Sequence, residues 1–286
     1  MKQIGWLAAL LVLCASSARA QFNGVSATLK LDQDEYLPGE DVQLKVRVVN
    51  RSGEEIKLGS DNRWLAVSIS QENNVPCPLL GEMPVQGEFT LESGEAGTRT
   101  VNPTPYYDFR QMGRYRVTAT VHLTQWGDQV TCPPVYFTIG HGVPLPNLEN
   151  IQFGVPVSSN GPPEVRAYSL LKVTRLKEES LYLRLTDAHG GILRVIPIAR
   201  MMSFSNPEAQ IDKLNNLHVL HQTGARTFNY SVISRDGLMI KRQTYDYAAT
   251  RPVLRLTVDG EIFVAGGQRV SSPTDFPPAG SESARQ

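Results

Sequence analysis

The chain has 286 residues, of which 41% are hydrophobic and 20% charged, a composition typical of globular rather than disordered proteins. Its 28 basic residues are balanced by 28 acidic ones, so no positive excess points to a nucleic acid or an anionic membrane as the partner. The length allows two domains of ordinary size, each with its own hydrophobic core.

The first 20 residues predict an export signal. Lys2 supplies a positive charge, residues 4–13 form an apolar run, and residues 18–20 (Ala-Arg-Ala) have the pattern of a cleavage site. The apolar run is shorter than the roughly 20 residues needed to cross a bilayer, so a retained membrane anchor is the weaker interpretation. We therefore expect a mature chain that begins at Gln21, has no transmembrane anchor, and is periplasmic or extracellular.

The cysteines fit export. Cys14 lies in the signal; it would be the acylated residue of a lipoprotein, but the preceding Leu13 is bulky where such motifs carry a small residue. Cys77 and Cys132 remain after cleavage, and two cysteines in an exported chain most simply form a structural disulfide. A redox or metal site made by the two thiols is the alternative, although no other ligands are spaced around them.

Residues 21–140 predict a run of short strands. A Pro-Gly turn at residues 36–39 and other turn signals separate apolar–polar alternations. The expected strands are residues 25–31, 42–49, 64–70, 87–92, 115–123 and 135–139. Many short strands in about 120 residues are typical of a β-sandwich.

Two segments of this part resemble a known family. The stretch "YLPGEDVQLKVRVVNRSGEEIKL" (residues 36–58) is similar to the opening of immunoglobulin-like domains of bacterial exported proteins, and "GRYRV" resembles their tyrosine-corner segment. The resemblance implies an immunoglobulin-like sandwich with Tyr115 in the corner. Val117 stands where antibody domains have a cysteine, so a Cys77–Cys132 bridge would be a different one. The similarity, shared loosely with sandwich-type proteinase-inhibitor domains, implies a fold more than an activity.

The rest of the chain predicts a second domain between two irregular segments. Residues 141–164 are rich in proline and glycine and are expected to form a linker. Residues 165–270 again predict strand after strand, a β-meander domain folded as a sandwich or a small barrel; a propeller fragment is less favoured because too few blades fit. Residues 271–286 are rich in proline and serine and are expected to form a disordered tail. The predicted fold class is all-β.

No catalytic or metal-binding constellation is predicted, and no cofactor is expected. His218 and His221 are three residues apart in an expected strand, so they would lie on opposite faces and serve as sheet residues rather than shared metal ligands. Asp187 and His189 share a hairpin turn, but no nucleophile motif accompanies them. Paired carboxylates of the glycosidase type need no local motif and remain open.

Surface aromatic residues are the candidate binding residues. An aromatic ring at a loop or strand surface can stack on a sugar or fill a partner's pocket. Trp126 is expected at a hairpin tip, where the alternative is a ring folded back on its own sheet. The candidates are Trp126, Tyr106, Tyr107, Tyr245 and Tyr247.

These features predict an exported, non-catalytic binding or adaptor protein of the cell envelope or extracellular space. Its partner would be another envelope or extracellular protein, or a glycan, and not a nucleic acid. One alternative is an inhibitor or accessory subunit of an exported hydrolase. Another is a carbohydrate-active enzyme with dispersed carboxylates.

Overall fold

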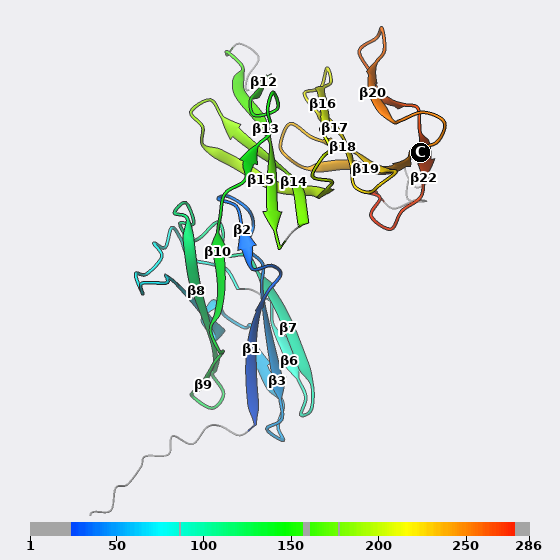
Figure 1. Cartoon of the computed structure of the whole chain (residues 1–286). Coiled ribbons are helices and arrows are strands. Elements are labelled where there is room, and N and C mark those ends of the chain that lie inside the picture. Colours follow the sequence, from blue (N-terminus) through cyan, green and yellow to red (C-terminus); the bar gives the residue numbers. More distant parts are fainter. Residues whose placement is uncertain (1–23, 86, 157–160, 177, 278–286) are drawn as a thin grey trace, which may run out of the picture.

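The computed structural model describes residues 24–85, 87–156, 161–176 and 178–277; the expected signal at residues 1–20 lies outside these ranges. Their regular elements are strands and one short 3-10 helix, η1 (Asn62–Trp64), which confirms the predicted all-β class. No helix in these ranges combines the length and the apolar character needed to span a membrane. Figure 1 shows two β domains that meet end to end.

The N-terminal domain consists mainly of two sheets packed over one core, antiparallel except for the parallel pair β2–β10. One sheet has the order β1 (Val25–Leu31), β3 (Leu44–Asn50), β7 (Ala96–Val101). The other has the order β2 (Glu35–Tyr36), β10 (Val135–Ile139), β8 (Gly113–Leu123), β5 (Leu65–Gln71), with β9 (Asp128–Thr131) also on β8. A short ladder joins β4 (Ile56–Leu58) to β6 (Phe89–Leu91). In β1 and β8, buried residues alternate with more exposed ones, so one face of each strand is buried, as the sequence pattern predicts.

Tyr115 makes the contact that a tyrosine corner requires. Its side chain is fully buried, and its hydroxyl donates a hydrogen bond to the backbone carbonyl of Gln111 at 2.7 Å. The ring stacks on Phe137, with 5.2 Å between centroids. The resemblance to immunoglobulin-like domains drew attention to Tyr115, and its partner Gln111 is found only in the structure.

The expected Cys77–Cys132 disulfide is not present; both cysteines are buried free thiols. The backbone N–H of Cys77 donates a hydrogen bond to the carbonyl of Ile69, on the edge of β5 that faces away from β8. The backbone N–H of Cys132 donates to the carbonyl of Ala119, on the edge of β8 that faces away from β5. Two strands therefore separate them, a distance of roughly 14 Å across the sheet. A disulfide needs Cα atoms within about 7 Å of each other. The disulfide was expected because two cysteines remain in a chain expected to be exported, and neither fact indicates how far apart the cysteines lie in the fold.

The C-terminal domain also packs two sheets face to face. The first contains β11 (Val143–Pro144), β13 (Glu164–Arg175), β14 (Glu178–Asp187) and β15 (Ile192–Met201), with β12 (Ile151–Val155) also on β13. The second has the order β16 (Glu208–Ile211), β17 (Leu217–Gln222), β18 (Thr227–Ile233), β19 (Met239–Asp246), β22 (Gln268–Val270). Both sheets are open among the described strands, so the domain is a sandwich and not a closed barrel.

Side chains from both sheets share one core, for example Leu170 and Leu183 from the first and Val219 and Ile233 from the second. The outer face of the second sheet is covered by the hairpin β20 (Val253–Leu256) and β21 (Ile262–Ala265). The central strands β17 and β18 are therefore buried on both faces.

Two segments expected to be irregular belong to this domain. The range expected as a linker, residues 141–164, carries β11 and β12, which pair with β13; Phe153 of β12 stacks on Tyr168 at 4.4 Å. Residues 271–277 of the expected tail pack on β19, because Arg242 and Phe276 exchange backbone hydrogen bonds. In both places, pairing with a distant strand orders a segment whose proline-rich composition predicted an irregular conformation. The rest of the expected tail, residues 278–286, lies outside the described ranges.

The Pro-Gly turn of the first domain forms the joint with the second. Leu37 packs into an apolar cluster with Leu171, Val173, Tyr182 and Val195 of the C-terminal domain. Gly39 has a φ of +82°, and its Cα lies so close to the second domain that a Cβ there would be 2.6 Å from Ile192 Cγ2. The turn predicted from the sequence is therefore also the contact that orients the two domains.

Candidate functional site

β17 places its two histidines on opposite faces of the second sheet, as predicted. His218 lies on the outer face, where its Nδ1 is 2.6 Å from the Tyr230 hydroxyl and its Nε2 is 3.2 Å from Asp212 Oδ2. Burial lowers the pKa of His218 although the Asp212 carboxylate opposes the shift. These contacts satisfy both ring nitrogens, which makes His218 a structural residue of the sheet.

His221 lies on the inner face and is only 1% exposed. Neither ring nitrogen has a hydrogen-bond partner among the described residues; the backbone of Arg200 approaches the ring without completing a bond of ordinary geometry. Burial, helped by the positive charge of Arg242, lowers the pKa of His221 to about 4. His221 is therefore neutral at physiological pH, and its neighbours across the sheet are Asn229 and then Thr244.

A hollow of about 370 Å³ opens beside this inner face. We name it the Arg242 hollow after its most deeply set charged residue. Its walls come from the end of β15, the β17–β18 hairpin, β18, β19 and the segment after β22. The lining residues are Ala199, Arg200, Thr223, Thr227, Asn229, Arg242, Thr244, Ser272 and Thr274.

Arg242 has a charge without a carboxylate partner among the described residues. One of its terminal nitrogens donates to the carbonyl of Ile198, and its Nε is buried without a partner. Its cross-strand neighbour Ser231 is fully buried, and the Ser231 hydroxyl also has no partner. Burial lowers the pKa of Arg242, but a guanidinium stays protonated in proteins. The hollow therefore has a partly desolvated positive charge with unused donors.

The hydroxyl groups of the hollow are oriented by carboxylates behind them. Thr227 Oγ1 donates to Asp246 Oδ1 at 3.1 Å, and Thr244 Oγ1 donates to Asp275 Oδ1 at 3.0 Å. The Asp275 side chain is 1% exposed and is paired with Arg269 at 2.8 Å. Burial acts to raise the pKa of Asp275, but the hydrogen bonds from Arg269 and its other partners outweigh burial and lower it.

Arg200 brings a second positive charge to the rim. It pairs with Glu178 at 3.5 Å, but the two side chains are 61% and 63% exposed. An ion pair that exposed is weak and exchanges readily with solvent or with another anion. The hollow thus has one inner and one outer guanidinium.

The residues predicted to bind a partner are not part of this hollow. Trp126 does lie at the β8–β9 hairpin tip, but its ring is partly buried against the first domain's core. Tyr107 is in the core and donates to the carbonyl of Val67 at 2.7 Å. Tyr106 is partly buried and lines a separate hollow of about 260 Å³.

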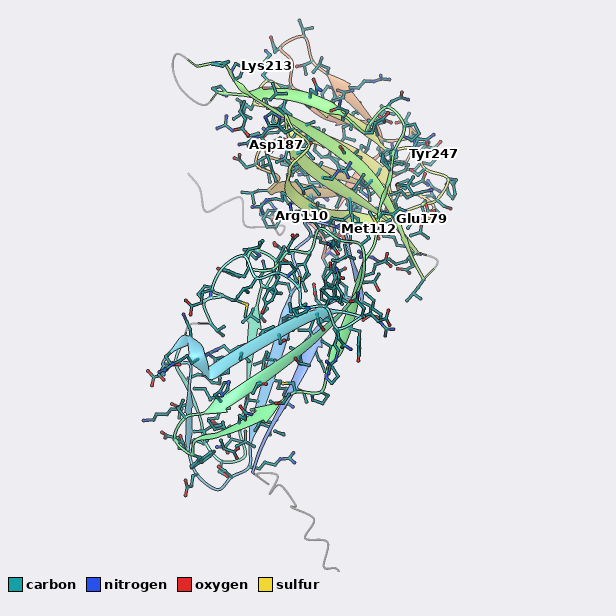
Figure 2. All side chains as sticks on the ribbon, turned by 90° about the vertical axis from the view of Figure 1, so that its left-hand side faces the viewer. Arg110, Met112, Glu179, Asp187, Lys213 and Tyr247 are labelled. Atoms are coloured by element: carbon teal, nitrogen blue, oxygen red, sulfur yellow. The ribbon has the colours of Figure 1, made fainter. Side chains whose placement is uncertain are left out.

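The two predicted tyrosines of the second domain are also separated. Tyr245 packs in the outer-face core beneath the β20–β21 hairpin. Tyr247 lies beyond the end of β19 and is 42% exposed, with the Arg226 guanidinium 5.5 Å from its ring centroid; Figure 2 shows it at the surface of the C-terminal domain. They do not form one aromatic surface.

The remaining polar motifs have structural roles. Asp187 accepts hydrogen bonds from the backbone of His189 and of Gly191, both at 2.8 Å, which closes the β14–β15 hairpin. Its position in the hairpin can be followed in Figure 2. Within the described part of the chain, no three His, Cys, Asp or Glu side chains gather as metal ligands.

Sequence reasoning missed the Arg242 hollow altogether. Its lining comes from segments up to 75 positions apart, between Ala199 and Thr274, and only sheet pairing brings them together. The one local signal was the run of polar residues Arg242-Gln243-Thr244 within the part of the chain expected to form strands. Arginine and threonine in a strand are, however, usual for a solvated face.

Comparison with known proteins gives little further guidance. No family model matches the chain, and no curated protein matches it. Among solved structures, the chain is similar to the crystal structure of Spo0M, a sporulation control protein from Bacillus subtilis. That match has a TM-score of 0.30 and 13% identity, and it covers 63% of this chain and 91% of the other.

Proposed function

We propose that the protein is an exported, non-catalytic binding protein of the cell envelope or extracellular space, and that the Arg242 hollow holds its ligand. One observation carries this proposal: Arg242 is partly buried, has no carboxylate partner among the described residues, and lines a hollow rich in hydroxyl groups. A desolvated guanidinium costs free energy unless an anion and hydrogen bonds compensate it. An oxyanion of a ligand would supply both.

The surroundings of Arg242 favour binding over catalysis. The buried carboxylate and the histidine there are not free to act as bases: Asp275 is bonded through both oxygens, and His221 is neutral and lies behind the wall. Catalysis of acyl or glycosyl transfer needs a free base or nucleophile within reach of the substrate. The volume of the hollow, about 370 Å³, lies in the range of small-molecule sites.

Native mass spectrometry of the mature chain tests the proposal. The protein would be purified from the envelope or culture medium of its own source, in a volatile buffer without added anions. We expect a bound small anion in the wild type and its loss in Arg242→Gln. Arg255→Gln is the matched control, because Arg255 lies exposed on β20, away from the hollow; it should retain the ligand.

Two outcomes would contradict the proposal. One is a wild-type chain that carries no small molecule and whose melting temperature responds to no anion. The other is equal retention by Arg242→Gln and the wild type, which would place the ligand elsewhere.

A further inference from the structure

We infer that the ligand of the Arg242 hollow is a sugar acid, a small molecule with one carboxylate and several hydroxyl groups. This inference rests on the proposed function and goes further by naming the chemistry that the hollow selects. It follows from which hydrogen-bond donors of the lining side chains are already bonded to other protein groups and which are free for a ligand.

The cationic group sets the first requirement. Arg242 lines the hollow, and because its Nε is fully enclosed by protein, its terminal nitrogens are the donors that a ligand carboxylate can reach. The nearby His221 is neutral and adds no charge. A single carboxylate therefore matches the inner part of the hollow.

The threonines set the second requirement. A hydroxyl has one proton to donate, and Thr227 and Thr244 donate theirs to the carboxylate oxygens of Asp246 and Asp275. What these hydroxyls still offer to a ligand is lone pairs. The ligand must therefore bring its own donors, as the hydroxyl groups of a sugar do; sulfate has none.

The segment after β22 adds a donor to the same wall. Ser272 Oγ and Thr274 Oγ1 lie 2.9 Å apart, so one of the two donates to the other. The proton of the second hydroxyl is left for a ligand. The hollow thus offers acceptors on the β18–β19 side and a donor on the other side, a mixture that suits groups able both to donate and to accept.

The fixed charges around the hollow disfavour a multiply charged anion. Asp246 and Asp275 lie directly behind the threonine hydroxyls, and of these two only Asp275 has an arginine partner. Arg200 at the rim is partly neutralised by Glu178. A dianionic phosphate near Thr227 would face the Asp246 carboxylate, whereas an uncharged sugar hydroxyl would not.

Isothermal titration calorimetry with the mature chain, residues 21–286, tests the inference. The probes are galacturonate, galactose and sulfate. We expect galacturonate to bind at least about tenfold more tightly than galactose, which lacks the carboxylate, and than sulfate, which lacks donors. Arg242→Gln should weaken galacturonate binding about tenfold or more, and Arg255→Gln should not.

A second variant separates the two requirements and does not alter Arg242. Thr227→Val removes one acceptor hydroxyl, so it should weaken galacturonate binding several-fold, by about the value of one hydrogen bond, and leave any residual sulfate binding unchanged. Melting temperatures of the variants show that each one is folded.

The outcomes distinguish this inference from the function on which it rests. If sulfate or galactose binds as tightly as galacturonate, the sugar-acid assignment is wrong. If galacturonate does not bind but an anion that is not a sugar acid copurifies and is lost in Arg242→Gln, the assignment is wrong and the binding function stands. If Arg242→Gln binds galacturonate as the wild type does, both are wrong.

Discussion

Glu40 of the N-terminal domain and Arg175 of the C-terminal domain form an ion pair of 3.5 Å at the centre of the joint. The Glu40 carboxylate is 4% exposed and also accepts hydrogen bonds from Gln33 Nε2, the Leu37 backbone and the Tyr182 hydroxyl. Arg175 in turn donates to Gln33 and Tyr182. The five residues form one network across the joint, so the orientation of the domains is tied to a buried charge.

Arg175→Met should destabilise the protein because it leaves Glu40 buried without a cation. Removing one partner of a fully buried pair costs about 3–5 kcal/mol. Arg175 is 23% exposed and Glu40 keeps its other hydrogen bonds, so we expect a decrease of about 2 kcal/mol in the free energy of unfolding. Urea denaturation measures it. The double variant Glu40→Gln/Arg175→Met should recover part of the loss.

Arg114→Met is the surface control for this prediction. It breaks the exposed Arg114–Glu72 pair, and it should leave the unfolding midpoint close to that of the wild type. If Arg175→Met is as mild as Arg114→Met, the buried network does not stabilise the joint.

Gly39→Ala should destabilise the joint more than Gly53→Ala destabilises its loop. Both glycines have positive φ, +82° and +90°, so both substitutions have a backbone cost of about 1–2 kcal/mol. Only at Gly39 would the new Cβ meet the other domain, at 2.6 Å from Ile192 Cγ2, since nothing lies within 4 Å at Gly53. We expect a further loss of about 1–3 kcal/mol at Gly39, measured by urea denaturation; equal losses would show that Ile192 moves away freely.

Stability should fall as the pH drops from about 6.5 to about 4, in part because of His221. Its pKa is lowered to about 4 in the folded chain from 6.5, so the unfolded chain binds the proton more tightly in this window. The full effect is about 3 kcal/mol, present above pH 6.5 and absent below pH 4. Unfolding free energies at pH 7.5 and pH 5 measure the part of it that is lost by pH 5, about 2 kcal/mol.

His221→Met should flatten this dependence. The substitution loses no hydrogen bond, because neither ring nitrogen has a partner among the described residues, and it removes the titrating group. A variant whose stability declines between pH 7.5 and 5 as steeply as that of the wild type would assign the decline to other groups.

The mature chain should contain two free thiols. Of the 3 cysteines in the sequence, Cys14 lies in the expected signal, which leaves Cys77 and Cys132. Burial raises the pKa of both thiols to about 11, so a thiol reagent should react slowly with the native chain and should titrate two thiols in denaturant without a reductant. A chain that shows none until it is reduced would contain the disulfide expected from the sequence.

Local patterns predicted the parts of the fold that depend on local contacts. The strands expected at residues 25–31 and 135–139 from their alternation and turn signals are present with these bounds as β1 and β10. The position of Tyr115 came from the resemblance to immunoglobulin-like domains, and its hydroxyl bonds to a residue only four positions away. In contrast, β11, β12 and the ordered segment around Phe276 exist because they pair with distant strands, and proline-rich composition conceals such pairing.

The candidate site was not predictable for a related reason. Trp126 was placed correctly at a hairpin tip, but whether its ring turns outward or onto the core depends on the packing of other strands. Arg242 looked like an ordinary polar residue of an expected strand. Its importance depends on β15 and on the residues around Phe276, which cover it from two sides.

β17 has a further consequence for how the chain finds its fold. All six of its residues are buried, so the usual alternation of exposed and buried positions cannot specify which side chains lie on which face of the sheet. A slip of one residue would exchange His218 with an apolar neighbour and break its contacts with Tyr230 and Asp212. The polar contacts of His218 therefore favour the register that the sheet has over a register shifted by one residue.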